Sequence, residues 1–547
     1  MTVPNRRRFV TGTLAAAAAA GTAGTAAAAP AAPASAAAAE AAAGAGPVEV
    51  GPADPRYADL AVRGSNKRFS ARPESFLLAA STEQVVRAVR EAVRDGKRVT
   101  VRSGGHCYEN FVGEASVRRV IDLSAMDTVR WDAARGAFEV GAGVRLMDLY
   151  RRLYYGWGVT LPGGASATVG VGGHVQGGGY GALSRRHGVS SDHLLAVEVV
   201  VVDAFGRARA VVATRDARDP HRELWWAHTG GGGGNFGVVT RYWFRSPSAR
   251  GADPRAALPR PHASVLTAGV MFPREGMTRN AMRTLVGNHG RWHERHSGPS
   301  SPYAGLFSGL VLLGHQGHND QGLAAIAFTH LDATLPDAPR LLQDHIDAVG
   351  AGVGVEAYAP PPQTLPWLAS VEELAAAQDT ETGRQKIKSA HLRRAFTDGQ
   401  IDVLYDFLGS TEHTNESSSV SLQSYGGRVN TVRPGATASA HRGSVMKALF
   451  MNTWQDPAHD AANVDWLRRL YAGVYRDTGG VPAPGERSEG CFINFPDVDM
   501  ADPRWNTSGV PWHELYYGDN YRRLQAVKAT WDPRDVFRHA LSVRAAR

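Results

Sequence analysis

Between residues 75 and 250, apolar and polar residues alternate in short patterns that are typical of both helices and strands. Val85, Val89 and Val93 recur at helical spacing and predict a helix from Thr82 to about Asp95. Short apolar or alternating runs predict strands at residues 98–102, 120–123, 138–144, 195–202 and 238–244, and a second helix at residues 146–155. This mixture predicts an α+β fold with a mixed sheet.

The pattern changes after residue 250. Residues 251–485 contain longer helical patterns, such as residues 371–379, and strands at residues 264–271 and 307–313, which predicts a second lobe. Residues 486–547 return to dense aromatic and glycine motifs, so we expect them to rejoin the first lobe, residues 50–250. The length of 547 residues fits three or four domains or one large two-lobed fold.

Residues 1–45 differ in composition from the rest of the chain. Arg6, Arg7 and Arg8 precede Phe9 and an apolar, Ala-rich stretch, which is the pattern of a secretory signal of the twin-arginine type. A membrane anchor is the alternative, but alanine and glycine are too weakly hydrophobic to span a bilayer well. We therefore predict export by the twin-arginine machinery, cleavage between about residues 29 and 47, and an extracellular mature form that binds no membrane.

Charge and cysteine content exclude other classes of protein. The formal net charge is +8, yet the basic residues are scattered, with no basic run outside residues 6–8. We interpret this charge as a solvated surface and expect no nucleic-acid partner. Two cysteines, Cys107 and Cys491, are too few for a disulfide framework. No metal site is predicted.

The first motif that points to chemistry follows the strand at residues 98–102. It reads Arg102-Ser103-Gly104-Gly105-His106-Cys107-Tyr108. Two glycines directly after a strand let backbone amides approach a diphosphate without an intervening side chain. The histidine at the end of the loop would face the same ligand. Taken alone, the motif could equally be a turn that carries an incidental surface histidine.

The second motif, residues 169–181, has seven glycines in thirteen residues. So many glycines are incompatible with a stable helix interior or strand, and we expect a backbone surface on which a flat or charged ligand lies. The spacing does not match a Rossmann fingerprint. A flexible linker is the alternative, but linkers do not interleave Val171, His174, Gln176 and Tyr180 with the glycines.

Two more motifs are weak by themselves. Residues 229–237 read T-G-G-G-G-G-N-F-G and lead into the strand at residues 238–244. A glycine-rich hairpin loop would have the same composition. Residues 516–521 read Y-Y-G-D-N-Y and are followed by Trp531-Asp532-Pro533. This last motif alone indicates only the start of an aromatic helix.

Together and in this order, the four motifs resemble the FAD-linked oxidases of the berberine-bridge-enzyme type, within the vanillyl-alcohol-oxidase superfamily. The resemblance covers about residues 55–545, and the combination is far more specific than any one motif. The chain looks most like the aclacinomycin-oxidoreductase type, which is secreted by actinomycetes and acts on sugar hydroxyls of natural products. The resemblance implies a two-lobed FAD-binding fold of the p-cresol methylhydroxylase type, with a second lobe, residues 251–485, of antiparallel sheet covered by helices that binds the substrate.

The resemblance also implies how FAD is held. The family links the flavin 8α-methyl group to the histidine of the first loop, here His106. His174 matches the histidine near the flavin N1–C2=O region, where a proton donor or cation stabilises the reduced form. The other residues expected at the cofactor are Arg102, Ser103, Gly104, Gly105, Cys107, Ser166, Val169, Gly170, Gly173, Gly178, Gly179, Asn235, Gly237, Val238, Tyr517 and Asn520.

Two positions depart from the family pattern. Ser166 stands where many members have a cysteine that bonds flavin C6, and a hydroxyl is too weak a nucleophile to do so. We therefore expect a single covalent link. Phe492 stands where relatives usually have the tyrosine that deprotonates the substrate hydroxyl. The remaining candidates for this proton acceptor are Tyr180, Tyr425, Tyr516 and His513, each of which is also compatible with a structural role.

Three hypotheses for the function follow. The first is an oxidase that transfers hydride from the alcohol of a small molecule to FAD, which molecular oxygen then reoxidises. The second is an oxidative cyclisation, rearrangement or desaturation of a secondary metabolite, because Phe492 lacks the hydroxyl of the usual base. The third is a flavin- or drug-binding resistance protein without turnover.

Overall fold

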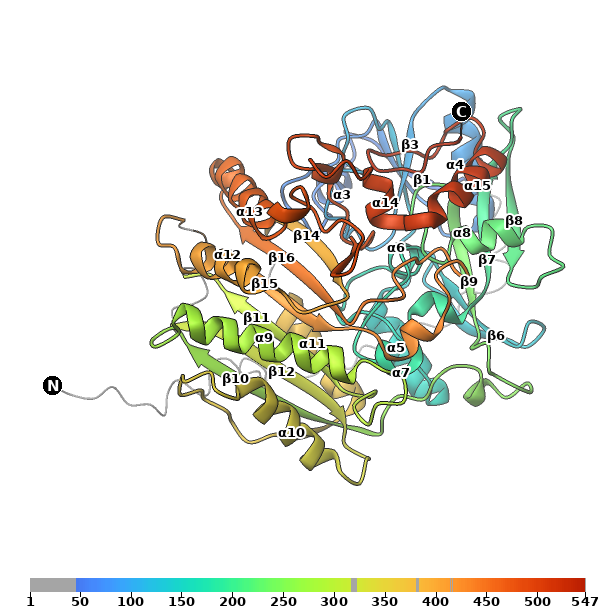
Figure 1. Cartoon of the computed structure of the whole chain (residues 1–547). Coiled ribbons are helices and arrows are strands. Elements are labelled where there is room, and N and C mark those ends of the chain that lie inside the picture. Colours follow the sequence, from blue (N-terminus) through green and yellow to red (C-terminus); the bar gives the residue numbers. More distant parts are fainter. Residues whose placement is uncertain (1–45, 316–321, 380–382, 414, 416, 547) are drawn as a thin grey trace, which may run out of the picture. The chain divides into compact units, whose positions relative to one another are not determined.

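The structure is a computed structural model that describes residues 46–546, apart from residues 316–321, 380–382, 414 and 416 (Figure 1). The predicted signal lies outside the described residues. Residues 46–547 form one compact unit, so the segment boundaries at residues 250 and 485 stay predictions. Among the helices of the described residues, none combines the length and apolarity needed to cross a bilayer.

Two small sheets are built from residues 48–244. The first has the order β1 (Val48–Val50), β2 (Ser75–Leu78), β4 (Arg119–Asp122), β3 (Val99–Arg102), and β2, β4 and β3 run parallel. The second is antiparallel, in the order β5 (Val129–Asp132), β6 (Ala137–Gly141), β9 (Val238–Phe244), β7 (Leu194–Val202), β8 (Ala208–Thr214). The helices of this region are α3 (Arg56–Ala61), α4 (Thr82–Arg94), α5 (Leu146–Trp157), α6 (Val171–Gln176), α7 (Ser184–His187) and α8 (Arg222–Ala227).

A large antiparallel sheet is built from residues 264–490. Its order is β13 (Gln363–Pro366), β10 (Ser264–Pro273), β12 (Leu323–Asp332), β11 (Phe307–Leu313), β15 (Ser417–Ser424), β16 (Met446–Trp454), β14 (Arg384–Leu392), β17 (Ser488–Gly490). The helices that pack against it are α9 (Arg279–His296), α10 (Ala338–Gly350), α11 (Trp367–Asp379), α12 (Asp398–Gly409) and α13 (Asp460–Val474) (Figure 1). The expected α+β fold, with an antiparallel sheet covered by helices, is confirmed.

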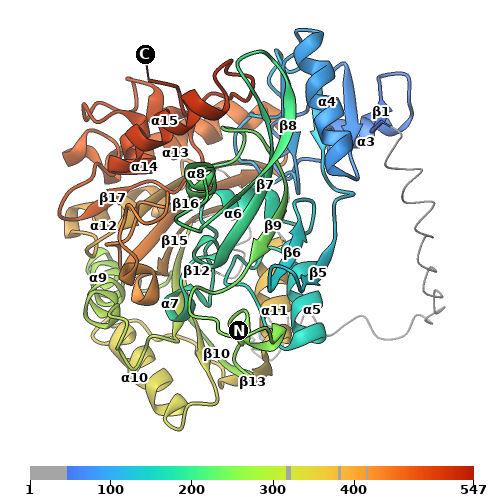
Figure 2. The same cartoon turned by 90° about the vertical axis from the view of Figure 1, so that its right-hand side faces the viewer.

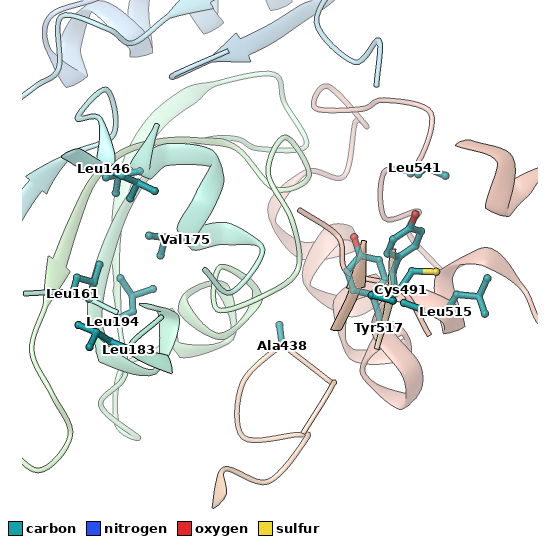
Figure 3. Packing of buried hydrophobic residues seen from close by; sticks show 14 of the residues in the cluster. Leu146, Leu161, Val175, Leu183, Leu194, Ala438, Cys491, Leu515, Tyr517 and Leu541 are labelled. Carbon is teal, nitrogen blue, oxygen red and sulfur yellow. The ribbon is translucent and has the colours of Figure 1, made fainter. Parts of the chain in front are cut away.

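The C-terminal segment packs against elements of residues 48–244. Its helices are α14 (Trp512–Tyr517) and α15 (Tyr521–Trp531), and α15 packs on α8 (Figure 2). Leu515 and Tyr517 lie with Cys491 in a buried cluster that also contains Val175 and Leu194 (Figure 3). This packing brings the last motif of the sequence to the same part of the molecule as the glycine motifs.

One prediction about the second motif is wrong. Its glycines were expected to exclude a helix, but residues 171–176 form α6. A Cβ at Gly172 would lie 2.6 Å from the Ala142 carbonyl oxygen and 3.0 Å from Ser103 Cβ. Close packing that only glycine allows therefore outweighs its unfavourable helix propensity, which is about 1 kcal/mol per residue.

Candidate active site

Buried charges fix the first loop at the end of β3. Arg102 Nε donates to Asp122 Oδ2 at 2.8 Å, and Arg63 Nη1 lies 2.6 Å from the same oxygen. Arg102 Nη1 also donates to the Leu60 carbonyl at 2.6 Å. Burial alone would raise the pKa of Asp122, but the charges of Arg102 and Arg63 hold it below its usual value. Arg102 therefore acts as the anchor of the glycine loop that follows it.

The first and second motifs are in direct contact. Ser103 Oγ donates to the Ala142 carbonyl at 2.6 Å, and a Cβ at Gly104 would lie 2.2 Å from the Gly170 amide nitrogen. Gly105 has a φ of +81°, which favours glycine, and turns the chain toward His106. At Gly173, in contrast, an added Cβ would meet no atom within 4 Å, and the residue is exposed. The paired loops therefore leave an open position at α6.

His106 faces the second motif. Its Nε2 lies 2.8 Å from Thr168 Oγ1, which places the imidazole beside the segment that carries Ser166 and Val169. The next residue, Cys107, is a free thiol, and burial raises its pKa to about 12. Cys107 is therefore a poor nucleophile at neutral pH, whereas the imidazole carries a ring nitrogen that can attack carbon.

His174 is a neutral imidazole in this structure. Burial, with a smaller effect from the Lys447 charge, lowers its pKa to about 4. Its Nε2 accepts a hydrogen bond from the Gly164 amide at 3.1 Å, so the ring proton is on Nδ1. The expectation of a proton donor is compatible with this geometry, but a cation at His174 is not supported at neutral pH.

Gly178 and Gly179 complete the second motif with φ values of +110° and +72°. A Cβ at Gly179 would lie 2.4 Å from Ser190 Oγ and 2.9 Å from His174 Cδ2. The tight turn after α6 therefore depends on glycine, and it sets the position of Tyr180.

The third and fourth motifs bind each other. Tyr517 Oη donates to the Gly231 carbonyl at 3.1 Å, and Asn235 Nδ2 donates to the same carbonyl at 2.9 Å. Asn520 Nδ2 donates to the carbonyl of Thr437 at 3.2 Å. Gly237 precedes Val238, the first residue of β9. A Cβ added at Gly237 would lie 2.5 Å from the Val200 carbonyl oxygen. These side chains hold the glycine loops in place.

Tyr180, Tyr425 and Phe492 meet in one buried aromatic cluster. The rings of Tyr180 and Tyr425 are 5.0 Å apart between centroids. Tyr180 Oη donates to the Ser424 carbonyl, and Tyr425 Oη donates to the His441 carbonyl at 3.3 Å. Burial raises the pKa values of both Tyr180 and Tyr425 above the ordinary tyrosine value. Both phenols are therefore protonated at neutral pH.

The other two predicted proton acceptors lie elsewhere. Tyr516 is in the main core, where its hydroxyl accepts a hydrogen bond from the Asp497 amide at 2.9 Å and burial raises its pKa. His513 stacks on Tyr521 with ring centroids 3.8 Å apart. Neither residue belongs to the aromatic cluster of Tyr180 and Phe492.

The loop at residues 491–495 joins this cluster to the glycine motifs. Asn494 Nδ2 donates to the His174 carbonyl at 2.9 Å. Phe495 packs on Tyr108, two residues after His106, with ring centroids 5.4 Å apart. The loop that carries Phe492 therefore contacts the backbone of His174 and the side chain of Tyr108, which follows His106 by two residues.

Sequence reasoning missed a lysine in this cluster. Lys447, on β16, is buried, and its Nζ lies 4.1 Å from the Tyr180 ring centroid and 4.9 Å from that of Phe492. A third ring, Phe495, is 5.0 Å away. Burial lowers the Lys447 pKa to about 7. The sequence offers no motif for it, because a lone lysine in an apolar strand gives no spacing to recognise.

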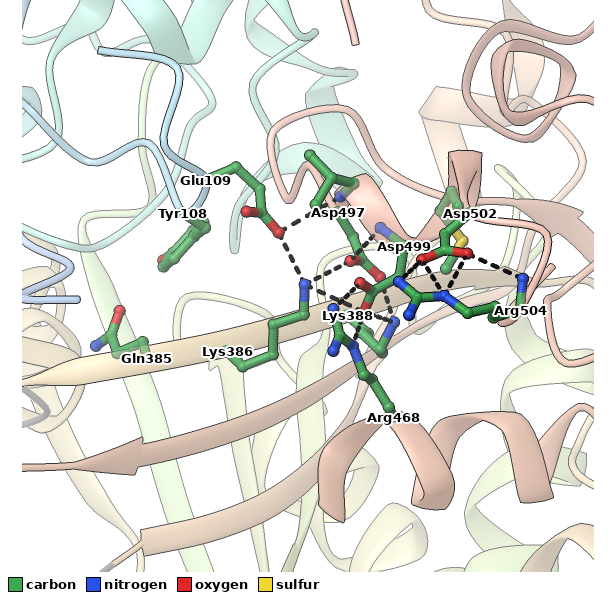
Figure 4. A network of polar contacts seen from close by, with 12 residues as sticks. Tyr108, Glu109, Gln385, Lys386, Lys388, Arg468, Asp497, Asp499, Asp502 and Arg504 are labelled. Atoms are coloured by element: carbon green, nitrogen blue, oxygen red, sulfur yellow. Dashed lines mark hydrogen bonds and ion pairs between the residues drawn. The ribbon is translucent and has the colours of Figure 1, made fainter. Parts of the chain in front are cut away.

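A buried ion network was also missed (Figure 4). Lys386 Nζ on β14 lies 2.8 Å from Glu109 Oε1 and 2.6 Å from Asp497 Oδ1. Lys388 Nζ lies 2.8 Å from Asp499 Oδ2, which also pairs with Arg468 through its other oxygen. Glu109 follows the His106 loop, so three positive and three negative side chains tie this loop to β14 and to the C-terminal segment. The expectation of solvated cations is wrong here.

The residues at the paired loops fit an FAD. The close contacts at Gly104 and Gly170 leave no room for side chains there, while the open surroundings of Gly173 leave space for a ligand at the backbone. His106 contacts Thr168 on the segment before α6, and His174 follows Gly173 on α6, where its carbonyl accepts a hydrogen bond from the loop that carries Phe492. In the described residues, no group of three or more histidine, cysteine, aspartate or glutamate side chains could hold a metal ion.

Comparison with known proteins decides the family. The model of an FAD binding domain matches residues 73–207, and the berberine and berberine-like model matches residues 491–544. Aclacinomycin-N/aclacinomycin-A oxidase of Streptomyces galilaeus is 51% identical over 91% of this chain and 90% of its own length. The chain belongs to the berberine-bridge-enzyme-like FAD-linked oxidases. It is therefore an FAD-dependent oxidoreductase.

Two more members of this family extend the comparison. The hexose oxidase of Chondrus crispus is 29% identical over 90% of this chain and 93% of its own length. A crystal structure of a glycopeptide hexose oxidase complexed with teicoplanin is 49% identical, with a TM-score of 0.87, over 91% of this chain and 99% of that chain. The fold of this family member is thus shared along nearly the whole described chain.

Proposed function

We propose that the protein oxidises a hydroxyl group of a sugar or of a glycosylated natural product, with FAD as hydride acceptor and molecular oxygen as final acceptor. The observation that carries this proposal is the convergence of His106, His174 and the Tyr180–Phe492 cluster on one place. Similar proteins support the substrate class, since they are named as oxidases of aclacinomycin, hexose and glycopeptide hexose.

The proposal includes a single covalent link between His106 and FAD. His106 Nε2 faces Thr168 across the contact between the first two motifs, where Gly173 leaves open space. Ser166, on the same segment, carries a hydroxyl in place of a thiol, and a hydroxyl is a weak nucleophile. A covalent bond would also keep the flavin on a protein that works outside the cell.

The residues of the site have distinct roles in this reaction. When bound, FAD supplies the hydride acceptor. His174, with its proton on Nδ1, donates a hydrogen bond to negative charge that develops nearby. The aromatic rings of Tyr180, Tyr425 and Phe492 exclude water and give the sugar or polyketide an apolar surface. Removing the substrate hydroxyl proton requires an acceptor within hydrogen-bond reach, and Phe492 cannot provide one.

A second function is favoured by one observation, the absence of a hydroxyl at Phe492. Oxidative cyclisation, rearrangement or desaturation of a secondary metabolite does not always begin with removal of an alcohol proton. A non-catalytic flavin- or drug-binding protein is the third alternative. It would use the same aromatic cluster without turnover.

Anaerobic mixing with glycosylated polyketides and hexoses tests the function. We expect the oxidised flavin absorbance to bleach, and in air we expect hydrogen peroxide in a one-to-one ratio with a product two mass units lighter than the substrate. Bleaching with a product of another mass would support the second function. No bleaching by any hydroxyl compound would contradict both enzymatic proposals.

A further inference from the structure

Phe492 leaves the aromatic cluster without the hydroxyl expected there, yet the cluster contains one basic group. This group is Lys447, whose side chain reaches from β16 into a space between the rings of Tyr180, Phe492 and Phe495. Its strand neighbours are His391 on β14 and Gln423 on β15. Resting on the function proposed above, we infer that the ε-amine of Lys447 is the proton acceptor for the substrate hydroxyl.

The surroundings of Lys447 separate it from every other buried lysine in the structure. Lys386, Lys388 and Lys528 each lie within 3 Å of a carboxylate oxygen. Among the described residues, no carboxylate lies within ion-pair distance of Lys447 Nζ, and no hydrogen-bond acceptor contacts it. A buried ammonium without a counter-ion is unfavourable, so burial favours the neutral amine and lowers the pKa of Lys447 to about 7.

The other candidate proton acceptors in the cluster, the hydroxyls of Tyr180 and Tyr425, already donate hydrogen bonds to backbone carbonyls. Tyr180 donates to the Ser424 carbonyl and Tyr425 to the His441 carbonyl. A phenol whose pKa is raised by burial does not accept a proton at neutral pH. A neutral amine has a free electron pair, and it is the only group of the described cluster that can accept a proton with a pKa near the working pH.

The substrate loses a proton and a hydride in this step. Its O–H bond breaks and the proton forms an N–H bond on Lys447, while the carbon-bound hydrogen leaves as hydride to the oxidised flavin. The alcohol carbon is oxidised by two electrons to a carbonyl carbon, and the flavin is reduced by the same two electrons. The resulting ammonium lies over the faces of three aromatic rings, at 4.1, 4.9 and 5.0 Å from their centroids, which stabilise a cation. The rings therefore favour the product side of the proton transfer.

The titratable groups around Lys447 change protonation outside the pH range in which Lys447 is expected to do so. Burial lowers the pKa of His174 to about 4 and holds the pKa of His391 well below its usual value. Burial raises the pKa values of Tyr180 and Tyr425. His441, which stacks on His391 at 4.3 Å, also has a pKa below its ordinary value. A change of protonation between pH 6 and 9 in this cluster is therefore assigned to Lys447.

Two substitutions test the role in the holoenzyme. Lys447→Met keeps the volume without the amine, and Lys447→Arg keeps a cation that cannot lose its proton. We expect both to slow flavin reduction by substrate by about 10²- to 10⁴-fold and to remove the fall in rate below pH 7. Lys97→Met, which removes a partly exposed lysine paired with Glu74, serves as the matched control and should leave the rate of flavin reduction unchanged. Full rescue by Lys447→Arg would overturn the inference, because it would assign Lys447 a purely electrostatic role.

A second measurement does not depend on turnover. The chain has only six lysines, so the side-chain NMR spectrum of lysine-labelled protein has few signals, and Lys447→Arg identifies the one that disappears. We expect this signal to titrate well below the ordinary lysine value of about 10.4. Titration at or above that value would overturn the inference. Wild-type protein whose flavin no alcohol reduces, despite a lowered Lys447 titration, would instead contradict the proposed function.

Discussion

At the scale of single residues, the site depends on which atoms can act as nucleophile or base. His106 is placed to hold FAD, and its neighbours Cys107 and Ser166 are poor nucleophiles for different reasons: burial raises the thiol pKa, and a hydroxyl is weakly nucleophilic. We therefore expect FAD to stay on the wild-type protein after acid or denaturant and to be released from His106→Ala. Mass spectrometry of flavin peptides measures this. Freely extractable wild-type flavin, or a second bond at Ser166, would contradict the single link.

A second residue-scale prediction concerns Phe492. Its ring centroid lies 4.9 Å from Lys447 Nζ, and the ring lies edge-on to His391, with ring centroids 5.6 Å apart. Phe492→Tyr adds a hydroxyl beside an existing proton acceptor, so we expect the rate of flavin reduction to rise or stay unchanged. Stopped-flow measurement of the flavin absorbance checks this. A large decrease would mean that the site needs an apolar ring here and would favour a reaction other than simple alcohol oxidation.

At the scale of secondary structure, the sequence predicted the regular elements well and the glycine-rich segment poorly. The strands at residues 238–244 and 307–313 match β9 and β11, because continuous apolar runs bounded by turn residues leave few alternatives. The helix α6 was missed because its stability comes from contacts with Ser103 and Ala142, which lie far away in the sequence. The general expectation of a solvated charged surface fails at Lys386 and Lys388 for the same reason, since their partners come from residues 109 and 497–499.

The buried network on β14 gives a prediction at this scale. Burial alone would raise the pKa of Asp499, but the nearby charges of Lys388, Lys386 and Arg468 lower it below its usual value. A carboxyl with a lowered folded-state pKa stabilises the fold fully above its unfolded value, about pH 4, and loses this contribution as the pH falls further. Asp499→Asn should reduce the free energy of unfolding by about 3–5 kcal/mol between pH 5 and 8, because it leaves buried cations underpaired.

The matched control for this prediction is Asp465→Asn, which removes an exposed pair with Arg469 on α13. Exposed pairs contribute about 0–1 kcal/mol, so its effect should be small. Chemical denaturation at several pH values measures both variants. An equal decrease in the free energy of unfolding for Asp499→Asn and Asp465→Asn would mean that the network does not hold β14 to the His106 loop.

At the scale of the whole molecule, the predicted export route implies that folding and FAD loading precede secretion, because the twin-arginine pathway carries folded proteins. We expect Arg6→Lys combined with Arg7→Lys to retain the protein in the cytoplasm, while the wild type is found outside. N-terminal sequencing of the secreted form should place its first residue between about residues 29 and 47. Normal secretion of the double variant would contradict a twin-arginine signal.

The distribution of lysines also decides how the enzyme can be attached to a surface. Lys386, Lys388, Lys447 and Lys528 are buried, and only Lys67 and Lys97 carry amines that reach the solvent. Both come from residues 46–100, and Lys97 already pairs with Glu74 at 2.5 Å. Coupling to an amine-reactive support would therefore use these two side chains and the terminal amine. Such coupling would leave the antiparallel sheet of residues 264–490 chemically untouched, so an electrode or bead prepared in this way would present every copy through the same few attachment points.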